Sequence, residues 1–253
     1  MEITDAETPA ADTRLAARAV SAVKIYGADD TEVRALDGVD IGFAQGCFTA
    51  IMGPSGSGKS TLMHCMAALD TLTSGQVIIG ETDLGTLGDR DLTLLRRNRV
   101  GFVFQAYNLV PTLTAMENIT LPMDLAGRRP DKGWLDTVIS TVGLGDRLSH
   151  RPSELSGGQQ QRVAVSRAMA GQPEIIFADE PTGNLDSRTG TGILEFMRRA
   201  VDEFGQTIVM VTHDPVAAAH ADTAVFLVDG RIHGELASPS ADEVLDYMKD
   251  LGD

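Results

Sequence analysis

Hydrophobic and polar positions along the 253-residue chain form two kinds of pattern. Near the N-terminus, apolar residues alternate with polar ones from Ala19 to Tyr26 and from Val33 to Phe43, which predicts two antiparallel strands. The turn-forming segment from Gly27 to Asp30 predicts the connection between them. Beyond residue 172, short apolar runs alternate with segments of helical periodicity. This alternation predicts a parallel sheet covered by helices.

The other predicted strands are short and apolar, and lie at Cys47–Met52, Val77–Ile79, Val100–Phe104, Ile175–Ala178, Thr207–Val211 and Ala224–Val228. Helical periodicity marks Ser60–Leu69, Arg90–Arg97, Ala115–Ala126, Lys132–Val142, Gly158–Ala170, Arg188–Phe204 and Pro215–Ala219. Between residues 106 and 171 helices follow one another without a strand, which indicates a separate helical part. The last stretch, 229–253, predicts a hairpin and an amphipathic helix, and the chain shows no internal repeat.

Composition and charge narrow the class of function. The formal net charge of −15 disfavours nonspecific binding to nucleic acid or anionic lipid, which would repel the protein. Cys47 and Cys65 are too few for a disulfide framework and are expected to be small core residues, and the five histidines show no metal-binding spacing. The longest stretch without charge, Ile41–Gly58, is broken by Gly, Gln, Pro and Ser, so it is not a transmembrane helix. Residues 1–17 are acidic, small or polar and predict a disordered tail rather than a signal peptide.

A phosphate-binding loop is the most specific motif, and it reads Gly53-Pro54-Ser55-Gly56-Ser57-Gly58-Lys59-Ser60. Its glycines let backbone N–H groups turn inward, Lys59 can reach the β- and γ-phosphates, and the Ser60 hydroxyl can bind Mg²⁺. Thr61 is expected at the α-phosphate. A glycine turn without a nucleotide is the alternative, but the strand before it and the helix after it favour a site for ATP and Mg²⁺.

Two carboxylates end the apolar strand that begins at Ile175. Asp179 is expected to bind the metal, and Glu180 is expected to be the general base that polarises the attacking water. An acidic pair at a strand end is often only solvated. Beside a phosphate-binding loop, the catalytic interpretation is favoured.

A second motif lies about a hundred residues after the first glycine of the loop, and it reads Leu155-Ser156-Gly157-Gly158-Gln159. It resembles the signature of the ATPase subunits of ABC (ATP-binding cassette) transporters. In that family the signature completes the ATP site of the facing subunit, so the resemblance implies a dimer of two copies with composite sites. Without the resemblance, Ser156 would be no more than a helix N-cap. The resemblance covers about Ala19 to Val228.

Four single residues gain a role only through this resemblance. Tyr26 resembles the aromatic residue that stacks on adenine, and Gln105 the loop glutamine that contacts Mg²⁺ and water and senses the membrane partner. His213 resembles the switch histidine that bonds the γ-phosphate. Asp186 ends the segment Gly183-Asn184-Leu185-Asp186, which is similar to the loop that crosses the dimer interface.

The resemblance also implies the fold and its division. It is an α/β fold, with a P-loop NTPase core built on a parallel sheet, an N-terminal antiparallel β subdomain and an inserted α-helical subdomain. We expect one ABC ATPase domain over residues 18–253, in which 18–105 and 172–253 form the nucleotide-binding core and 106–171 the helical signature subdomain.

Three segments indicate the branch of the family, and they lie at Arg99–Gln105, Asn108–Asn118 and Ser156–Val165. They are similar to the subgroup that serves lipoprotein release, macrolide export and peptide-antibiotic resistance. This implies a cytoplasmic subunit, held at the inner face of the plasma membrane by an integral membrane permease, that hydrolyses Mg-ATP to drive export or extraction. A cell-division or signalling ATPase that drives an extracytoplasmic partner without transport is the alternative. A single cassette and the negative charge disfavour a protein of translation or DNA repair.

The partner-binding region is expected after Gln105, where the resemblance implies a groove for a short cytoplasmic helix of the permease. The apolar residues expected to be exposed there are Tyr107, Leu109, Val110, Leu113 and Met116. Ordinary packing inside the helical part is the alternative.

Overall fold

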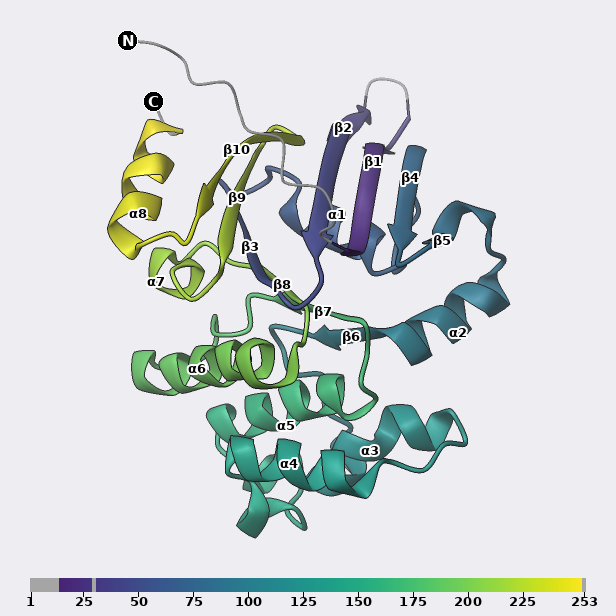
Figure 1. The fold of residues 1–253 in the computed structure, drawn as a ribbon, viewed down its shortest axis with the longest axis vertical. Helices are drawn as coiled ribbons and strands as arrows, with labels where there is room; N and C mark the ends of the chain where they lie inside the picture. Colours follow the sequence, from purple (N-terminus) through teal and green to yellow (C-terminus); the bar gives the residue numbers. More distant parts are fainter. Residues whose placement is uncertain (1–13, 29–30, 252–253) are drawn as a thin grey trace.

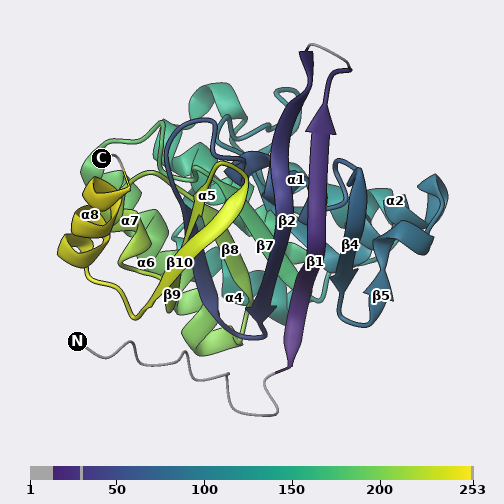
Figure 2. The ribbon, with the colours of Figure 1, turned by 90° about the horizontal axis from the view of Figure 1, so that it is seen from above.

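Two β-sheets and a set of helices build the part of the chain that the computed structural model describes, residues 14–28 and 31–251 (Figure 1). The first sheet is antiparallel, in the order β2-β1-β4-β5. Its strands are β1 (Leu15–Tyr26), β2 (Val33–Ala44), β4 (Ser74–Ile79) and β5 (Thr82–Asp83). Figure 2 shows β2, β1 and β4 side by side in this order. The two N-terminal strands predicted from alternation are thus confirmed, and Asp29 and Asp30 of the predicted turn lie outside the described residues.

The tail was expected to end at residue 17, and this boundary was wrong because β1 begins at Leu15. Residues 15–17 belong to β1, where Leu15 pairs with Ala44 and the side chains of Ala16 and Ala17 are buried. Burial of these small apolar residues stabilises the start of the strand. Residues 1–13 of the expected tail lie outside the described residues.

The second sheet carries the parallel core, in the order β10-β9-β3-β8-β7-β6. Its strands are β3 (Phe48–Met52), β6 (Val100–Val103), β7 (Ile175–Asp179), β8 (Ile208–Val211), β9 (Thr223–Val228) and β10 (Arg231–Ala237). All are parallel to their neighbours except β10, which forms an antiparallel hairpin with β9. Every residue of β3 and β8 is buried, as expected for strands covered on both faces.

Helices cover both faces of this sheet and build the helical insertion. They are α1 (Lys59–Met66), α2 (Asp89–Arg99), α3 (Ala115–Leu125), α4 (Lys132–Val142), α5 (Gly157–Ala170), α6 (Ser187–Phe204), α7 (Pro215–Ala218) and α8 (Ala241–Asp250). Single 3₁₀ turns lie at Leu84–Thr86, Gly145–Arg147 and Pro152–Glu154. The helices α3, α4 and α5 pack together as the insertion, which confirms the predicted fold class.

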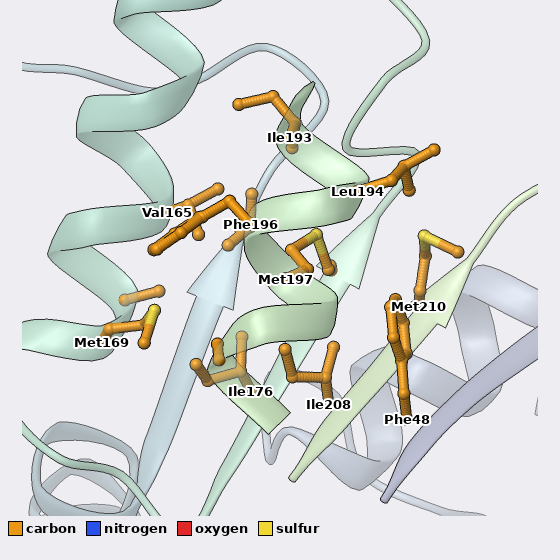
Figure 3. Packing of buried hydrophobic residues seen from close by; sticks show 14 of the residues in the cluster. Phe48, Val165, Met169, Ile176, Ile193, Leu194, Phe196, Met197, Ile208 and Met210 are labelled. Atoms are coloured by element: carbon orange, nitrogen blue, oxygen red, sulfur yellow. The ribbon is translucent and has the colours of Figure 1, made fainter. Parts of the chain in front are cut away.

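Two clusters of buried hydrophobic residues hold these layers together. The larger joins α3, α4, α5 and α6 to one face of the parallel sheet, and Figure 3 shows Met197 of α6 among Ile176, Ile208 and Met210 of the strands. The smaller joins α1 and the antiparallel sheet to the other face of the parallel sheet. Cys65 is buried in it, whereas Cys47 is only partly buried, so the expectation of a core cysteine holds for Cys65 alone.

Candidate active site

The predicted catalytic residues gather at one edge of the parallel sheet. The phosphate-binding loop follows β3, Gln105 follows β6, Asp179 ends β7 and His213 follows β8. Because these strands are parallel and adjacent, their carboxyl ends meet at the same edge, where α/β folds bind ligands. The sheet topology thus brings together residues that are up to 160 positions apart in the sequence.

Glycine is required by geometry at two positions of the loop. Gly53 and Gly58 have φ of 141° and 101°, which L side chains rarely adopt. A Cβ atom at Gly53 would lie 2.0 Å from the carbonyl oxygen of Leu227, and one at Gly58 would lie 2.2 Å from that of Ala35. Among the described residues, no side chain caps α1, which begins at Lys59. The N–H groups of its first turn are therefore available to an anion.

The Lys59 ammonium is folded back over the loop. Its Nζ donates hydrogen bonds to the carbonyl oxygens of Gly53 and Pro54, at 2.9 and 2.8 Å. Burial lowers the pKa of Lys59, and the charges of Glu180 and Asp179 act against this by raising it. Phosphate oxygens are stronger acceptors than carbonyls, so an anion in the loop can take over these bonds.

The two carboxylates at the end of β7 differ in environment. Burial raises the pKa of Asp179, the nearby Glu180 charge raises it further, and His64 and Lys59 lower it. Glu180 has a φ of 45°, unusual for a residue with a side chain, and its N–H donates to the carbonyl oxygen of Val211 at 2.9 Å. Strained backbone of this kind gathers at functional sites, because it aims a side chain in a direction that a regular strand would not allow.

The Glu180 side chain meets the histidine that follows β8. Its Oε1 lies 2.8 Å from Nδ1 of His213. The Glu180 side chain is 17% exposed and that of His213 is 73% exposed. The histidine is therefore anchored by one ring nitrogen while most of the ring remains accessible.

Gln105 lies against the loop that contains Asp186. Its backbone oxygen accepts a hydrogen bond from Nδ2 of Asn184 at 2.8 Å, and a Cβ atom at Gly183 would lie 3.1 Å from its Nε2. Asp186 itself caps α6 and accepts hydrogen bonds from N–H and Oγ1 of Thr189. These contacts place the segment 183–186 next to Gln105.

Tyr26 stands beside the helix that follows the phosphate-binding loop. It is 41% exposed at the end of β1, and its hydroxyl donates to Oδ2 of Asp70 at 2.6 Å. Burial and the bond to Asp70 raise the pKa of Tyr26, whereas the nearby Thr61 lowers it. Tyr26 thus lies near Thr61, the residue expected at the α-phosphate.

The signature opens α5 in the helical insertion. Ser156 caps this helix, and Gln159 completes a reciprocal pair of hydrogen bonds with it. A Cβ atom at Gly158 would lie 2.1 Å from Cγ2 of Thr189, so the signature packs directly on α6. Within the described residues, no hydrogen bond joins Ser156, Gly157, Gly158 or Gln159 to the phosphate-binding loop, which opens α1 between the two sheets (Figure 1).

A residue that sequence reasoning missed links the signature helix to the segment after Gln105. Arg167 of α5 donates from Nη1 to the carbonyl oxygen of Asn108 at 2.6 Å and from Nη2 to that of Tyr107 at 2.9 Å. Tyr107 and Asn108 both have left-handed backbone, with φ of 59° and 48°. Burial lowers the pKa of Arg167. The signal in the sequence was a single charge within the otherwise uncharged run 163–170.

The apolar residues expected to be exposed after Gln105 are in fact all partly buried. The structure contradicts this expectation because Leu109 and Met116 pack against the larger core cluster, and buried Asn118 bonds both backbone groups of Val110. The other two residues of that expected set, Tyr107 and Leu113, are also partly buried.

An apolar groove lies close by, between α1, α2 and α3. Its volume is about 530 Å³, and its lining includes Leu69, Phe102, Leu121, Pro122 and Leu125. Leu125 is 71% exposed and Leu69 47% exposed. Arg96 and Arg97 also line this groove.

Over residues 14–28 and 31–251, no helix combines the length and the apolar character that crossing a membrane requires.

Comparison with known proteins agrees with the geometry of this site. The ABC transporter family model matches residues 36–183. An uncharacterized ABC transporter ATP-binding protein of Thermotoga maritima is 49% identical over 213 residues, which are 83% of this chain and 91% of that protein. The lipoprotein-releasing system ATP-binding protein LolD of Geobacter metallireducens is 44% identical, over 83% of this chain and 94% of LolD. The macrolide export ATP-binding/permease protein MacB of Nitrosomonas europaea is 45% identical over 81% of this chain but only 31% of MacB.

Solved structures show the same architecture. The dimeric structure of MJ0796, a bacterial ABC transporter cassette, has a TM-score of 0.80 and 39% identity, and covers 88% of this chain and 99% of that one. A second dimeric structure of MJ0796, in a post-hydrolysis state bound to ADP and Pi, has a TM-score of 0.79. The resemblance of the motifs is thus confirmed: the chain belongs to the ABC transporter family, among relatives that include LolD and MacB.

Proposed function

We propose that this chain is the ATP-binding subunit of an ABC transporter. In this proposal it binds and hydrolyses Mg-ATP between two copies of itself and powers a separate permease of the export or extraction type. The main support for the proposal is that the strands bring Lys59, Asp179, Glu180 and His213 to one edge of the sheet. The signature lies elsewhere, at the start of α5. We also propose that 18–253 is one ABC ATPase domain, with the signature subdomain at 106–171.

The separation of the two motifs supports a site shared between copies. The P-loop offers N–H groups and a cation to a triphosphate, and Ser156 with Gly157 offers a second anion site at the N-terminus of α5. No hydrogen bond between described residues joins the two motifs in one copy. A second copy can bring its signature to the phosphates, and the similar cassette MJ0796 was solved as a dimer.

Hydrolysis follows from the charges at the sheet edge. Lys59 and the N–H groups of the loop would hold the phosphates, leaving the γ-phosphate at the side of Glu180 and His213. Glu180 would accept the proton of the attacking water as general base. An ionised carboxylate can only accept, so the contact at 2.8 Å means that His213 presents Nδ1–H to Glu180. Nε2 would donate to a γ-phosphate oxygen when the ring carries a proton on both nitrogens.

The donor set fits Mg²⁺. Ser60, Asp179 and Gln105 offer hydroxyl, carboxylate and amide oxygens, which are the ligands that this ion prefers. No cluster of three or more His, Cys, Asp or Glu among the described residues could hold a metal by itself. This agrees with a site that phosphate oxygens and water complete, and Asp179, whose pKa burial raises, would gain a cation there. Bound Mg²⁺ would offset the negative charge of the phosphates.

The groove at Leu125 is the proposed docking site of the permease at the inner face of the membrane. Its lining is mostly apolar, and Leu125 and Leu69 project enough surface to anchor an amphipathic helix. The groove also includes Arg167, whose guanidinium holds the backbone of Tyr107 and Asn108 beside Gln105. A helix in the groove would therefore contact the same residue that shapes the segment after Gln105, which would couple docking to the site.

Light scattering of the purified protein tests the proposal. The Glu180→Gln chain should be a monomer without nucleotide and a dimer with Mg-ATP, because ATP at the interface would not be consumed. Lys59→Ala in the same background is the control and should stay monomeric. Dimerisation that is independent of ATP, or hydrolysis per chain that does not fall on dilution, would contradict the shared site.

A further inference from the structure

Asp70 is fixed to the last turn of the helix that follows the phosphate-binding loop. The N–H groups of Leu69 and Asp70 both donate to the carbonyl oxygen of His64, at 2.8 and 3.2 Å. Ala68, between them and the helix, has left-handed backbone with a φ of 57°. These bonds satisfy the end of α1 and leave the Asp70 carboxylate in a set position relative to the helix.

This carboxylate holds two side chains of β1 at the same time. Tyr26 Oη donates to Oδ2 at 2.6 Å, and Lys24 Nζ donates to Oδ1 at 2.6 Å. Lys24 also donates to the carbonyl oxygen of Thr71 at 2.7 Å, and its side chain is only 11% exposed. Although burial acts in the opposite direction, the bonds from Lys24 and Tyr26 lower the pKa of Asp70. Asp70 therefore stays ionised and balances the buried charge of Lys24.

The same cluster fixes the orientation of the Tyr26 ring. Lys24 Nζ lies over the ring at 4.7 Å from its centroid, within the range of a cation–π contact. The ammonium covers one face, while Tyr26 as a whole keeps 41% of its surface exposed. With its hydroxyl bonded to Asp70 and one face covered, the ring is preorganised for a flat ligand on the other face. Preorganisation raises affinity because the side chain loses little freedom on binding.

We propose that Asp70 is a positioning residue for the nucleotide base: it sets the ring of Tyr26 at a fixed place relative to the phosphate-binding loop. This inference rests on the proposed function, in which the loop binds the phosphates and Tyr26 stacks on adenine. One helix of eight residues, roughly 12 Å long, carries the loop at its start and Asp70 just beyond its end. The distance between the base platform and the phosphate site is then set by α1, and Asp70 acts on base binding rather than on the chemical step.

Calorimetry with two probes tests this assignment on the full chain. Mg-ADP carries base and phosphates, whereas Mg-pyrophosphate carries phosphates alone. Tyr26→Phe removes only the hydroxyl that Asp70 holds, and should raise the Kd for ADP by about 2- to 12-fold, the effect of one lost hydrogen bond. Tyr26→Leu removes the stacking ring and should raise that Kd by about 5- to 150-fold. Neither change should alter the Kd for pyrophosphate.

Variants of the carboxylate separate positioning from folding. Asp70→Ala should raise the KM for ATP as Tyr26→Phe does and leave kcat within about twofold, and the double variant should be no worse than the larger single one. If Asp70→Ala does not fold because Lys24 is left unpaired, Tyr26→Phe decides alone, since it keeps the Lys24–Asp70 pair. Asp40→Ala is the matched control, because Asp40 is an exposed carboxylate of β2 whose one hydrogen bond among the described residues comes from the N–H of Ser21.

Two results would overturn the inference. One is an unchanged Kd for ADP in Tyr26→Phe, and the other is an equal loss of pyrophosphate binding, which would show that the cluster acts through the loop. Failure of the proposed function is a different outcome, since the unmodified protein would then bind neither ADP nor pyrophosphate.

Discussion

Glu180 and His213 are in direct contact, with Oε1 of the carboxylate 2.8 Å from Nδ1 of the imidazole. The contact joins the ends of the neighbouring strands β7 and β8, whose backbones are also bonded there through the N–H of Glu180 and the oxygen of Val211. These contacts hold both side chains at the sheet edge. Such preorganisation lets charged groups act without rearrangement during the reaction.

The first prediction is that Glu180→Gln retains ATP binding and slows hydrolysis by about 10²- to 10⁴-fold, the range for loss of a general base. Binding is retained because Lys59 and the loop are unchanged. Phosphate release and calorimetry measure the two effects. Glu235→Gln, an exposed carboxylate on β10, is the control and should hydrolyse normally. A Glu180→Gln chain that hydrolyses near the normal rate would exclude Glu180 as the base.

The second prediction concerns the shared site. Ser156→Arg blocks the signature and Lys59→Ala disables the loop, so homodimers of either variant should be inactive. In a mixed dimer, the intact loop of one chain faces the intact signature of the other, and one of the two sites is restored. Mixing the two inactive proteins should therefore yield measurable ATPase activity. Absence of activity in mixtures that light scattering shows to contain mixed dimers would argue against composite sites.

The third prediction concerns the packing of the signature helix on α6. Gly158→Ala would place a Cβ atom 2.1 Å from Cγ2 of Thr189, and Thr189 cannot easily turn away because it makes two hydrogen bonds to Asp186. We expect a loss of about 1–3 kcal/mol in the free energy of unfolding, typical of overpacking. Denaturant unfolding measures it.

Thr189→Ser provides the matched test, because it removes the clashing methyl group and keeps the hydroxyl that bonds Asp186. In this background Gly158→Ala should recover most of the lost stability. If the loss is the same in both backgrounds, the contact with Thr189 is not its cause.

Sequence reasoning predicted the residues of the candidate site but not the side chains that hold them. Motifs such as the loop at Gly53–Ser60 are visible in sequence because the chemistry requires particular residues at fixed spacing. Asp70 and Arg167 were missed because each acts through a contact set by tertiary structure. Asp70 meets Tyr26 across 44 positions, and Arg167 meets Tyr107 across 60.

The burial of the segment after Gln105 could not be predicted for a related reason. Apolar residues such as Leu109 and Met116 have the same pattern whether they face a partner or their own core. Only the packing of α3 against α5 decides between the two. Within residues 106–171, all of which the structure describes, the exposed large hydrophobic side chain is instead Leu125, at the end of α3.

The last prediction tests the groove as the docking site of the permease. Leu125→Asp places a charge on a side chain that is 71% exposed, so the fold should tolerate it. ATP binding and unstimulated hydrolysis should be unchanged, because the groove lies apart from Lys59 and Glu180. Binding to the permease and stimulation of hydrolysis by it should be lost, since a desolvated carboxylate would face the apolar helix. Co-purification from membranes and ATPase assays with the reconstituted permease measure both.

Leu245→Asp is the matched control for this groove variant, because Leu245 is 45% exposed on α8, at a distance in the fold from the lining of the groove. It should assemble and respond to the permease normally. If Leu125→Asp behaves like this control, the permease does not dock in this groove. If both variants lose binding, added negative charge on an already acidic protein is the cause rather than a specific contact, because each substitution moves the net charge from −15 further from zero. Only a loss confined to Leu125→Asp assigns the exposed end of α3 to the partner.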